Sequence, residues 1–151
     1  MCRAWEAAAA RASGAGIRTV QARIGIVLTP AGGALQLQAP AFWLGLGGHV
    51  GPPDQYLPWI TIDDVLGGLY HLLWQDNVSG GVNLTAPNPA RMDTYADTLA
   101  HVLNRSARLN IPSDVVRRLA GEMADEMLLK SVRAVPRRLT ESGYEFGHEN
   151  L

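Results

Sequence analysis

Two adjacent carboxylates, Asp63 and Asp64, stand where a short apolar run, residues 58–62, leads into a longer one. Adjacent acids can act as a general acid and base, can hold a metal ion, or can begin a helix. Thr61 lies three residues before Asp64, which is the spacing of a capping box. The neighbouring sequence adds neither a second catalytic group nor further metal ligands. We therefore interpret the pair as a helix cap, with a role in an active site as the alternative.

The histidines, the cysteine and the lysine do not stand at the spacings of known catalytic or metal sites. The four histidines fall in no His-Glu-x-x-His pattern: His49, His71, His101 and His148. Cys2 is the only cysteine, so the chain can form neither an internal disulfide nor a thiolate cluster for a metal. The only lysine, Lys130, does not follow any tyrosine at the four-residue spacing found in hydride-transfer enzymes. We therefore expect no metal ion and no catalytic residue in this chain.

A glycine-rich stretch, residues 45–51, resembles a phosphate-binding loop. Gly45 and Gly47 could be the first two glycines of a Gly-x-Gly-x-x-Gly motif, but Val50 takes the third place. The stretch also runs into Gly-Pro-Pro rather than into a helix, so it fails as a dinucleotide fingerprint. We interpret it as a flexible loop.

Composition and charge exclude several classes of function. The net charge of −1 gives no electrostatic reason to expect nucleic acid or an anionic membrane as a partner. No apolar run is long enough to span a membrane, and the N-terminus carries charges where a signal peptide needs an apolar stretch. We therefore expect a cytoplasmic protein. One lysine among 13 basic residues, with much alanine and glycine, suggests a GC-rich bacterial gene.

Helical and extended segments alternate along the first part of the chain. Residues 3–13 are rich in alanine and predict a helix that ends at one of the two glycines that follow. Residues 17–28 predict a strand whose end is apolar on both faces, as in a strand buried inside a parallel sheet. Residues 30–56 are rich in glycine and proline and predict a long loop, with at most a short helix before Pro40.

The alternation continues through the second part. After a short strand at 59–62, residues 64–75 predict a helix whose apolar side chains cover most of its circumference, so we expect it to be buried. Its Gly67-Gly68 pair suits a place where another element packs very close. The remaining expected elements are strands at 81–87 and 107–112 and helices at 92–105, 113–129 and 135–146. The order of elements predicts an α/β fold class. It opens with a helix and a buried-type strand, which form half of a crossover unit.

Several stretches, in order, resemble one family. They are residues 2–9 (CRAWEAAA), 23–35 (RIGIVLTPAGGAL), 58–65 (PWITIDDV), 83–103 (NLTAPNPARMDTYADTLAHVL) and 121–146 (GEMADEMLLKSVRAVPRRLTESGYEF). Together they resemble the C-terminal half of epimerase/dehydratase-like proteins of the extended short-chain dehydrogenase/reductase superfamily. Within that superfamily they are similar to the subgroup that ends in a small C-terminal domain of unknown function.

The resemblance implies the C-terminal half of a Rossmann-like NAD(P)-binding fold with its small α/β substrate-side domain. It predicts the last helix-strand unit of the Rossmann-like domain at 1–30, a linking segment at 31–90 and the C-terminal domain at 91–151. The family binds NAD or NADP through its N-terminal half. This chain begins after the region where the family's catalytic serine and tyrosine lie, so we expect no tight cofactor binding by the chain alone.

Cofactor contacts carried over from the family fall on one strand. That strand typically reads Arg-x-x-Asn-Val-Tyr-Gly-Pro and approaches the nicotinamide end of the cofactor. The resemblance therefore implies cofactor-binding roles for Arg23, Gly25 and Ile26, although Ile26 replaces the asparagine and Leu28 the tyrosine.

Substrate contacts are expected in the loop 44–57 and just after it. The resemblance implies substrate-binding roles for Gly47, Gly48, Gln55 and Trp59, toward a small molecule that the sequence does not identify. Leu57 stands where nucleotide-sugar epimerases often carry an arginine that contacts the diphosphate. A leucine cannot donate to phosphate, which argues against a nucleoside-diphosphate sugar as the substrate.

Three hypotheses remain open from the sequence. The leading one is the substrate-side portion of an NAD(P)-dependent epimerase or oxidoreductase that is inactive alone. The second is a stand-alone interaction or regulatory module whose apolar helix is covered by a partner, either a homodimer or a missing N-terminal half. The third is a truncated product without a function of its own.

Overall fold

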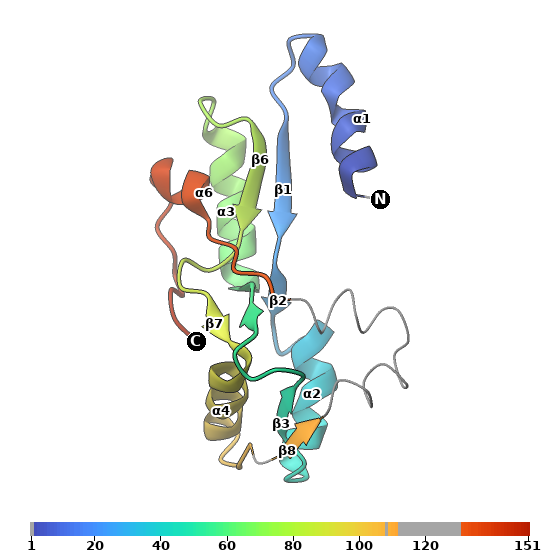
Figure 1. The fold of residues 1–151 in the computed structure, drawn as a ribbon. Helices are drawn as coiled ribbons and strands as arrows, with labels where there is room; N and C mark the ends of the chain where they lie inside the picture. Colours follow the sequence, from blue (N-terminus) through green and yellow to red (C-terminus); the bar gives the residue numbers. More distant parts are fainter. Residues whose placement is uncertain (1, 108, 112–130) are drawn as a thin grey trace.

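The computed structural model describes residues 2–107, 109–111 and 131–151 (Figure 1). The helix predicted at 113–129 lies outside these residues. The elements are α1 (Cys2–Gly14), β1 (Val20–Ile24), β2 (Ile26–Leu28), α2 (Gly33–Trp43), β3 (Gly48–Val50), β4 (Tyr56–Leu57), β5 (Trp59–Thr61), α3 (Ile62–Trp74), β6 (Gly80–Leu84), β7 (Ala90–Arg91), α4 (Met92–Val102), β8 (Leu109–Ile111) and α6 (Arg137–Glu141). Their alternation confirms the α/β class.

The first long strand changes partners at Gly25. β1 pairs in parallel with β6, with Val20 opposite Gly80 and Ile24 opposite Leu84. β2 pairs in parallel with β5. The Gly25 N–H donates to the carbonyl of Leu84 at 2.9 Å, and the next N–H donates to the carbonyl of Pro58 at 2.7 Å. A Cβ atom at Gly25 would overlap that Pro58 oxygen. The predicted strand 17–28 is therefore two strands, and glycine allows the backbones to approach where they meet.

Helix α3 packs one face against the sheet and against α6. The core cluster comprises Ile60, Val65, Leu72, Val78, Val82, Leu84 and Leu139, all buried. A Cβ atom at Gly68 would lie 2.8 Å from a methyl group of Leu84, so the glycine allows the close approach that the sequence predicted. At the C-terminal end of the helix, the guanidinium of Arg18 donates to three backbone carbonyls, each at 3.1 Å. Two belong to the last turn of α3, Leu72 and Leu73, and the third is that of Val78 in the following loop.

Two surfaces predicted to be buried are exposed. On α3, Leu66 is 60% and Leu73 is 70% exposed, so the expectation of a fully buried helix is wrong for this chain. On β1, Ile24 is 48% exposed. The reason is the same in both places: within the described residues β1 has a strand on one edge only, and the neighbours of α3 leave the side with Leu66 and Leu73 uncovered. The apolar residues at these exposed positions are of the kind that a larger sheet, with a further strand and a covering helix, would bury.

Residues 33–43 form a helix where the sequence predicted mainly loop. α2 runs through Pro40 to Trp43, although a proline inside a helix removes one backbone hydrogen bond. Tertiary packing offsets this cost, because Phe42 is buried against Ala96 and Ala100 of α4. In contrast, the helix predicted at 135–146 is shorter than expected. α6 covers five residues and is followed by Gly143, whose φ is +85°.

The elements form an upper and a lower group in Figure 1. The upper group contains α1, β1, β6, α3 and α6, and the lower group contains α2, β3, β8 and α4. β3 and β8 pair in parallel, while β4 and β7 pair antiparallel. The core cluster around Ile60 draws on residues from 60 to 139, so it crosses the predicted boundary at 90; the three-part division stays a prediction. No described helix has the length and apolarity to cross a membrane.

Candidate functional site

Asp64, one of the two adjacent acids, is buried at the start of α3 and is only 2% exposed. Its Oδ1 accepts hydrogen bonds from the Gly147 N–H at 2.8 Å and the Tyr144 hydroxyl at 3.1 Å. Its Oδ2 accepts from the His148 N–H at 3.0 Å and the Thr61 hydroxyl at 2.9 Å. We call this arrangement the Asp64 clasp. It holds the chain segment after α6 against the beginning of α3.

The capping-box spacing gave the correct start of α3, but the cap is Thr61 and not the aspartate pair, because the Asp64 oxygens are taken by the Thr61 hydroxyl and the segment after α6. Thr61 is the N-cap residue of α3, and its hydroxyl oxygen accepts the Asp64 N–H at 3.2 Å. Asp63 is exposed in the first turn, where its charge faces the positive end of the helix dipole. The sequence did not reveal the distant partners of Asp64, because Tyr144 and His148 lie 80 and 84 residues further along the chain.

The clasp fixes the protonation states of its two main members. Burial of Asp64 raises the pKa of its carboxyl, but the hydrogen bonds from Gly147, Thr61, Tyr144 and His148 together outweigh burial and hold that pKa below its usual range. Burial, followed by the hydrogen bond to the charged carboxylate, raises the pKa of the Tyr144 phenol to about 12. At neutral pH the carboxylate is ionised and the phenol is protonated. The pair therefore positions the chain and is not poised to exchange a proton.

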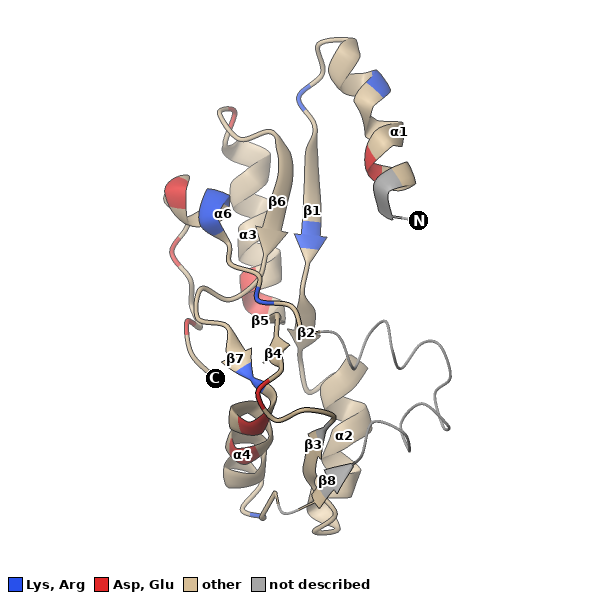
Figure 2. Ribbon diagram, viewed as in Figure 1, with Lys and Arg blue, Asp and Glu red and all other residues tan. Residues whose placement is uncertain are grey.

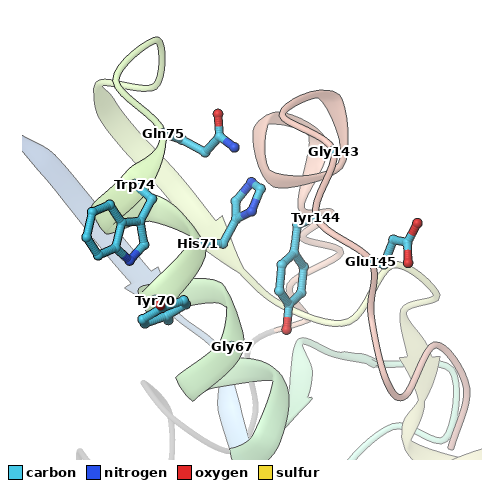
Figure 3. Close-up of a pocket in the computed structure, with 8 residues that line it drawn as sticks. All are labelled: Gly67, Tyr70, His71, Trp74, Gln75, Gly143, Tyr144 and Glu145. Carbon is cyan, nitrogen blue, oxygen red and sulfur yellow. The ribbon is translucent and has the colours of Figure 1, made fainter.

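A pocket of about 550 Å³ opens beside the clasp (Figure 3). It is lined by Gly67, Tyr70, His71, Trp74 and Gln75 of α3 and its end, and by Gly143, Tyr144 and Glu145. In Figure 3, Tyr70 and Trp74 stand on one side of Gly67, and His71 and Tyr144 stand on the other. A Cβ atom at Gly67 would overlap the Tyr144 hydroxyl, so the glycine leaves room for this wall.

The residues predicted to contact a cofactor lie at the meeting point of β1 and β2. Arg23 is exposed and donates to both carboxylate oxygens of Glu6 in α1, at 2.7 and 2.9 Å. Gly25 lies at the change of strand partner, and Ile26 pairs with Trp59 across β2 and β5. Their roles toward a cofactor stay predictions.

The described residues do not form a dinucleotide cradle by themselves. The turn between β2 and α2, residues 29–32, carries a single glycine before the helix begins at Gly33, and β5 leads directly into α3. A dinucleotide fingerprint needs three spaced glycines between a strand and a helix. The stretch 45–51 instead includes β3, and residues 44–47 connect α2 to that strand.

The residues predicted to contact substrate are divided between two places. Gly47 and Gly48 flank the start of β3, where a Cβ atom would overlap the Phe42 ring or the Leu109 carbonyl. Their positions thus have a packing explanation, and part of the predicted flexible loop is a strand. The other two, Gln55 and Trp59, lie nearer β5. Substrate binding by any of the four stays a prediction.

Gln55 and Trp59 are both buried in this chain. The indole N–H of Trp59 donates to the carbonyl of Asn88 at 3.1 Å. The backbone carbonyl of Gln55 accepts the N–H of Met92, at the start of α4, at 2.8 Å. These contacts connect β5 to the loop after β6, and the loop before β4 to α4 in the lower group.

Comparison with known proteins gives relatives along the whole chain. The chain is 40% identical over 151 residues to an epimerase family protein of Mycobacterium bovis, covering 100% of this chain and 50% of that protein. It is also 40% identical over 147 residues to the human epimerase family protein SDR39U1, covering 97% of this chain and 50% of that protein. The chain thus spans about half the length of the curated relatives it matches.

Solved structures show the same relationship. The crystal structure of human SDR39U1 with NADPH superposes with a TM-score of 0.84 at 37% identity, covering 89% of this chain and 45% of that one. A nucleoside-diphosphate sugar epimerase from Corynebacterium glutamicum superposes with a TM-score of 0.76 at 30% identity, covering 99% of this chain and 28% of that one. Residues 111–151 match a family model described as a domain of unknown function, DUF1731.

Proposed function

Because this chain has the sequence and the fold of the C-terminal portion of an epimerase family protein of the short-chain dehydrogenase/reductase type, we propose that it supplies the substrate-side half of an NAD(P)-dependent epimerase or oxidoreductase. The remaining half would supply the cofactor site and the catalytic tyrosine. The human relative was crystallised with NADPH, which supports a nicotinamide cofactor for the complete enzyme.

The observation that carries this proposal is an apolar surface at the open edge of the sheet. Ile62, Leu66, Leu69 and Leu73 follow one another along one side of α3 at helical spacing, and we call them the aliphatic stripe. Beside the stripe lies a hollow of about 230 Å³ lined by Arg18, Val20, Ala22, Leu69, Leu72 and Leu73. The hollow thus joins α3 to the strand whose second edge has no partner in the described residues.

Parallel sheets need neighbours on both edges and cover on both faces. Purely parallel strands occur almost only where helices bury both sides of the sheet. Here β1 and β6 form a parallel pair with β1 largely open to solvent. A further strand beside β1, with a helix against the aliphatic stripe, would complete the doubly wound layer. The N-terminal portion of the family provides elements of this kind.

The substrate would meet this chain at the carboxyl end of β2. Ligands of open α/β sheets bind at the carboxyl ends of the strands. There the turn 29–32 leads to the N-terminus of α2, whose first residue, Gly33, has a φ of +67°. Bound nicotinamide would accept or donate a hydride; this chain's residues would orient the substrate beside it. Leu57 is buried and offers no donor to a diphosphate, so we propose a substrate other than a nucleotide sugar.

A split-protein experiment tests the proposal. The N-terminal half of the Mycobacterium bovis relative, which this chain does not cover, is co-expressed with this chain, and NADPH binding is followed by its fluorescence. We expect saturable binding by the assembled halves and none by this chain alone. Tight NADPH binding or turnover by the isolated 151 residues would overturn the proposal.

A matched pair of variants tests the surface. Leu66→Asp places a charge in the aliphatic stripe and should abolish assembly of the halves, because an unpaired buried charge is costly. Leu37→Asp changes an exposed leucine of α2 and should leave assembly unchanged. If Leu66→Asp assembles as well as the unmodified chain, the stripe is not the contact surface.

A further inference from the structure

We propose that the pocket beside Gly67 is a binding site for a guanidinium cation, as carried by an arginine side chain. The pocket lies on the side of α3 that faces the C-terminal segment. Gly67 and His71 are four residues apart on that side, whereas the aliphatic stripe follows the other side of the helix. A partner half seated on the stripe would therefore border this pocket at Tyr70, which is four residues after Leu66 and three before Leu73, and would leave the side of Gly67 and His71 uncovered.

The shape of the pocket suits a flat group. The Tyr144 hydroxyl lies where a side chain of Gly67 would be, so this aromatic wall stands close to the helix, and aromatic side chains stand on both sides of the pocket (Figure 3). On one side Tyr70 and Trp74 meet edge to face, with ring centres 6.1 Å apart. On the other, Tyr144 meets His71 in the same manner at 5.5 Å. A planar guanidinium stacks on aromatic faces more readily than an ammonium does.

One wall of the pocket is exposed, and the other is held in place by hydrogen bonds. Tyr70 is 65% and Trp74 is 72% exposed, which is unusual for aromatic side chains that serve only the core. Tyr144 cannot swing away freely, since its hydroxyl is bonded to Asp64 and its ring contacts Phe146 at 4.9 Å between centres. His71 is held through Nε2 by the Ser142 hydroxyl at 2.9 Å. A preformed wall lowers the entropic cost of binding.

The charges around the pocket favour a cation. Its eight lining residues include Glu145 and the Gln75 amide as acceptors and contain no lysine or arginine. Figure 2 shows acidic positions at the beginning of α3, in α6 and in the C-terminal segment after it, with basic positions only in α6 among these. Both of those arginines are engaged: Arg137 pairs with Glu141 at 3.2 Å, and Arg138 donates to the carbonyls of Ser79 and Gly81.

Nuclear magnetic resonance of the full chain, with the indole N–H of Trp74 as the probe, tests the proposal. We expect N-acetyl-arginine amide to shift this resonance saturably, and the citrulline analogue, which is neutral but nearly isosteric, to leave it unchanged. Trp74→Ala, which lacks the indole and is followed through the backbone N–H of Gly67, should weaken binding at least about fivefold, and Glu145→Gln should weaken it less. Trp43→Ala removes an exposed tryptophan of α2 and serves as the control.

Two arms of the titration distinguish the source of the cation. A short peptide with a central arginine that binds more tightly than the free amide indicates a partner polypeptide, and equal affinity indicates a small cationic ligand. Both results support the site. An unchanged Trp74 resonance, or equal shifts with arginine and citrulline, would overturn it. Circular dichroism of each variant shows whether the helix content has been kept.

Discussion

The hydroxyl of Tyr144 donates a hydrogen bond of 3.1 Å to Oδ1 of Asp64, and the two residues are 80 positions apart in the chain. Through this contact the segment after α6 closes over the beginning of α3. The same carboxylate also accepts two backbone N–H groups from that segment. One buried side chain thus joins the N-terminal cap of a helix to the C-terminal part of the fold.

Replacing Asp64 by asparagine should destabilise the protein by about 1–3 kcal/mol. The amide has one acceptor oxygen and would turn its NH₂ group toward either the Gly147 N–H or the His148 N–H, leaving a buried donor without a partner. The free energy of unfolding is measured by urea denaturation. Asp63→Asn is the matched control, because Asp63 is exposed and should change stability by less than about 0.5 kcal/mol. Equal losses in the two variants would contradict the clasp.

Acid should weaken the clasp. The pKa of Asp64 is lower in the folded protein than the value near 3.9 of a free aspartate, so folding favours the ionised form. Its contribution to stability is complete above that value and disappears as the pH falls through the folded pKa. The stability difference between the unmodified protein and Asp64→Asn should therefore shrink between about pH 5 and the folded pKa. A difference that stays constant down to about pH 2 would contradict this.

Alkali should also destabilise the protein, through Tyr144. Its phenol pKa is raised to about 12 in the folded state from an ordinary value near 10, so its contribution is complete below pH 10 and is lost as the pH rises through 12. Tyr144→Phe should cost about 1 kcal/mol at neutral pH and should reduce the loss of stability above pH 10. Tyr70→Phe, at an exposed position of α3, is the control. Tyr95 has a similarly raised pKa of about 12, so part of the alkaline loss should persist in Tyr144→Phe.

Gly25→Ala should destabilise the protein by at least about 1–3 kcal/mol, since the new methyl group would overlap the carbonyl oxygen of Pro58. Gly25 and Pro58 each lie between two paired strands, and the Gly25 N–H and the Pro58 carbonyl are both hydrogen-bonded, so neither can move without breaking backbone hydrogen bonds. Gly14→Ala, at the end of α1, adds a methyl group where nothing lies within 4 Å and should be neutral or stabilising. Thermal unfolding followed by circular dichroism compares the two variants. A Gly25→Ala variant as stable as Gly14→Ala would refute the proposed close contact.

Local patterns in the sequence predicted the features that depend on neighbouring residues. The threonine three residues before Asp64 located the start of α3, and the alternation of apolar segments gave the α/β class. The helix across Pro40 was missed because its stability comes from Phe42 packing on α4, more than fifty residues later in the chain. The helix propensities of residues 33–43 do not depend on that contact and could not predict it.

The candidate sites show the same limit. Asp64 was identified by its spacing from Thr61, but nothing within the local sequence connects it to Tyr144. The pocket beside Gly67 combines helix residues with a turn about 75 positions away, so no short motif could have indicated it. The expected burial of α3 and β1 was wrong for another reason. The apolar pattern records the neighbours for which the sequence is suited, and the described residues include only some of them.

The long separation between Asp64 and its donors has a consequence for synthesis. A ribosome makes Thr61 and Asp64 well before it makes residues 144–148, so α3 first emerges with its carboxylate solvated by water. Closure over that carboxylate is a long-range step, which loop entropy makes slow relative to helix formation. The N-terminal end of α3 is thus completed late, after the C-terminal segment has left the ribosome.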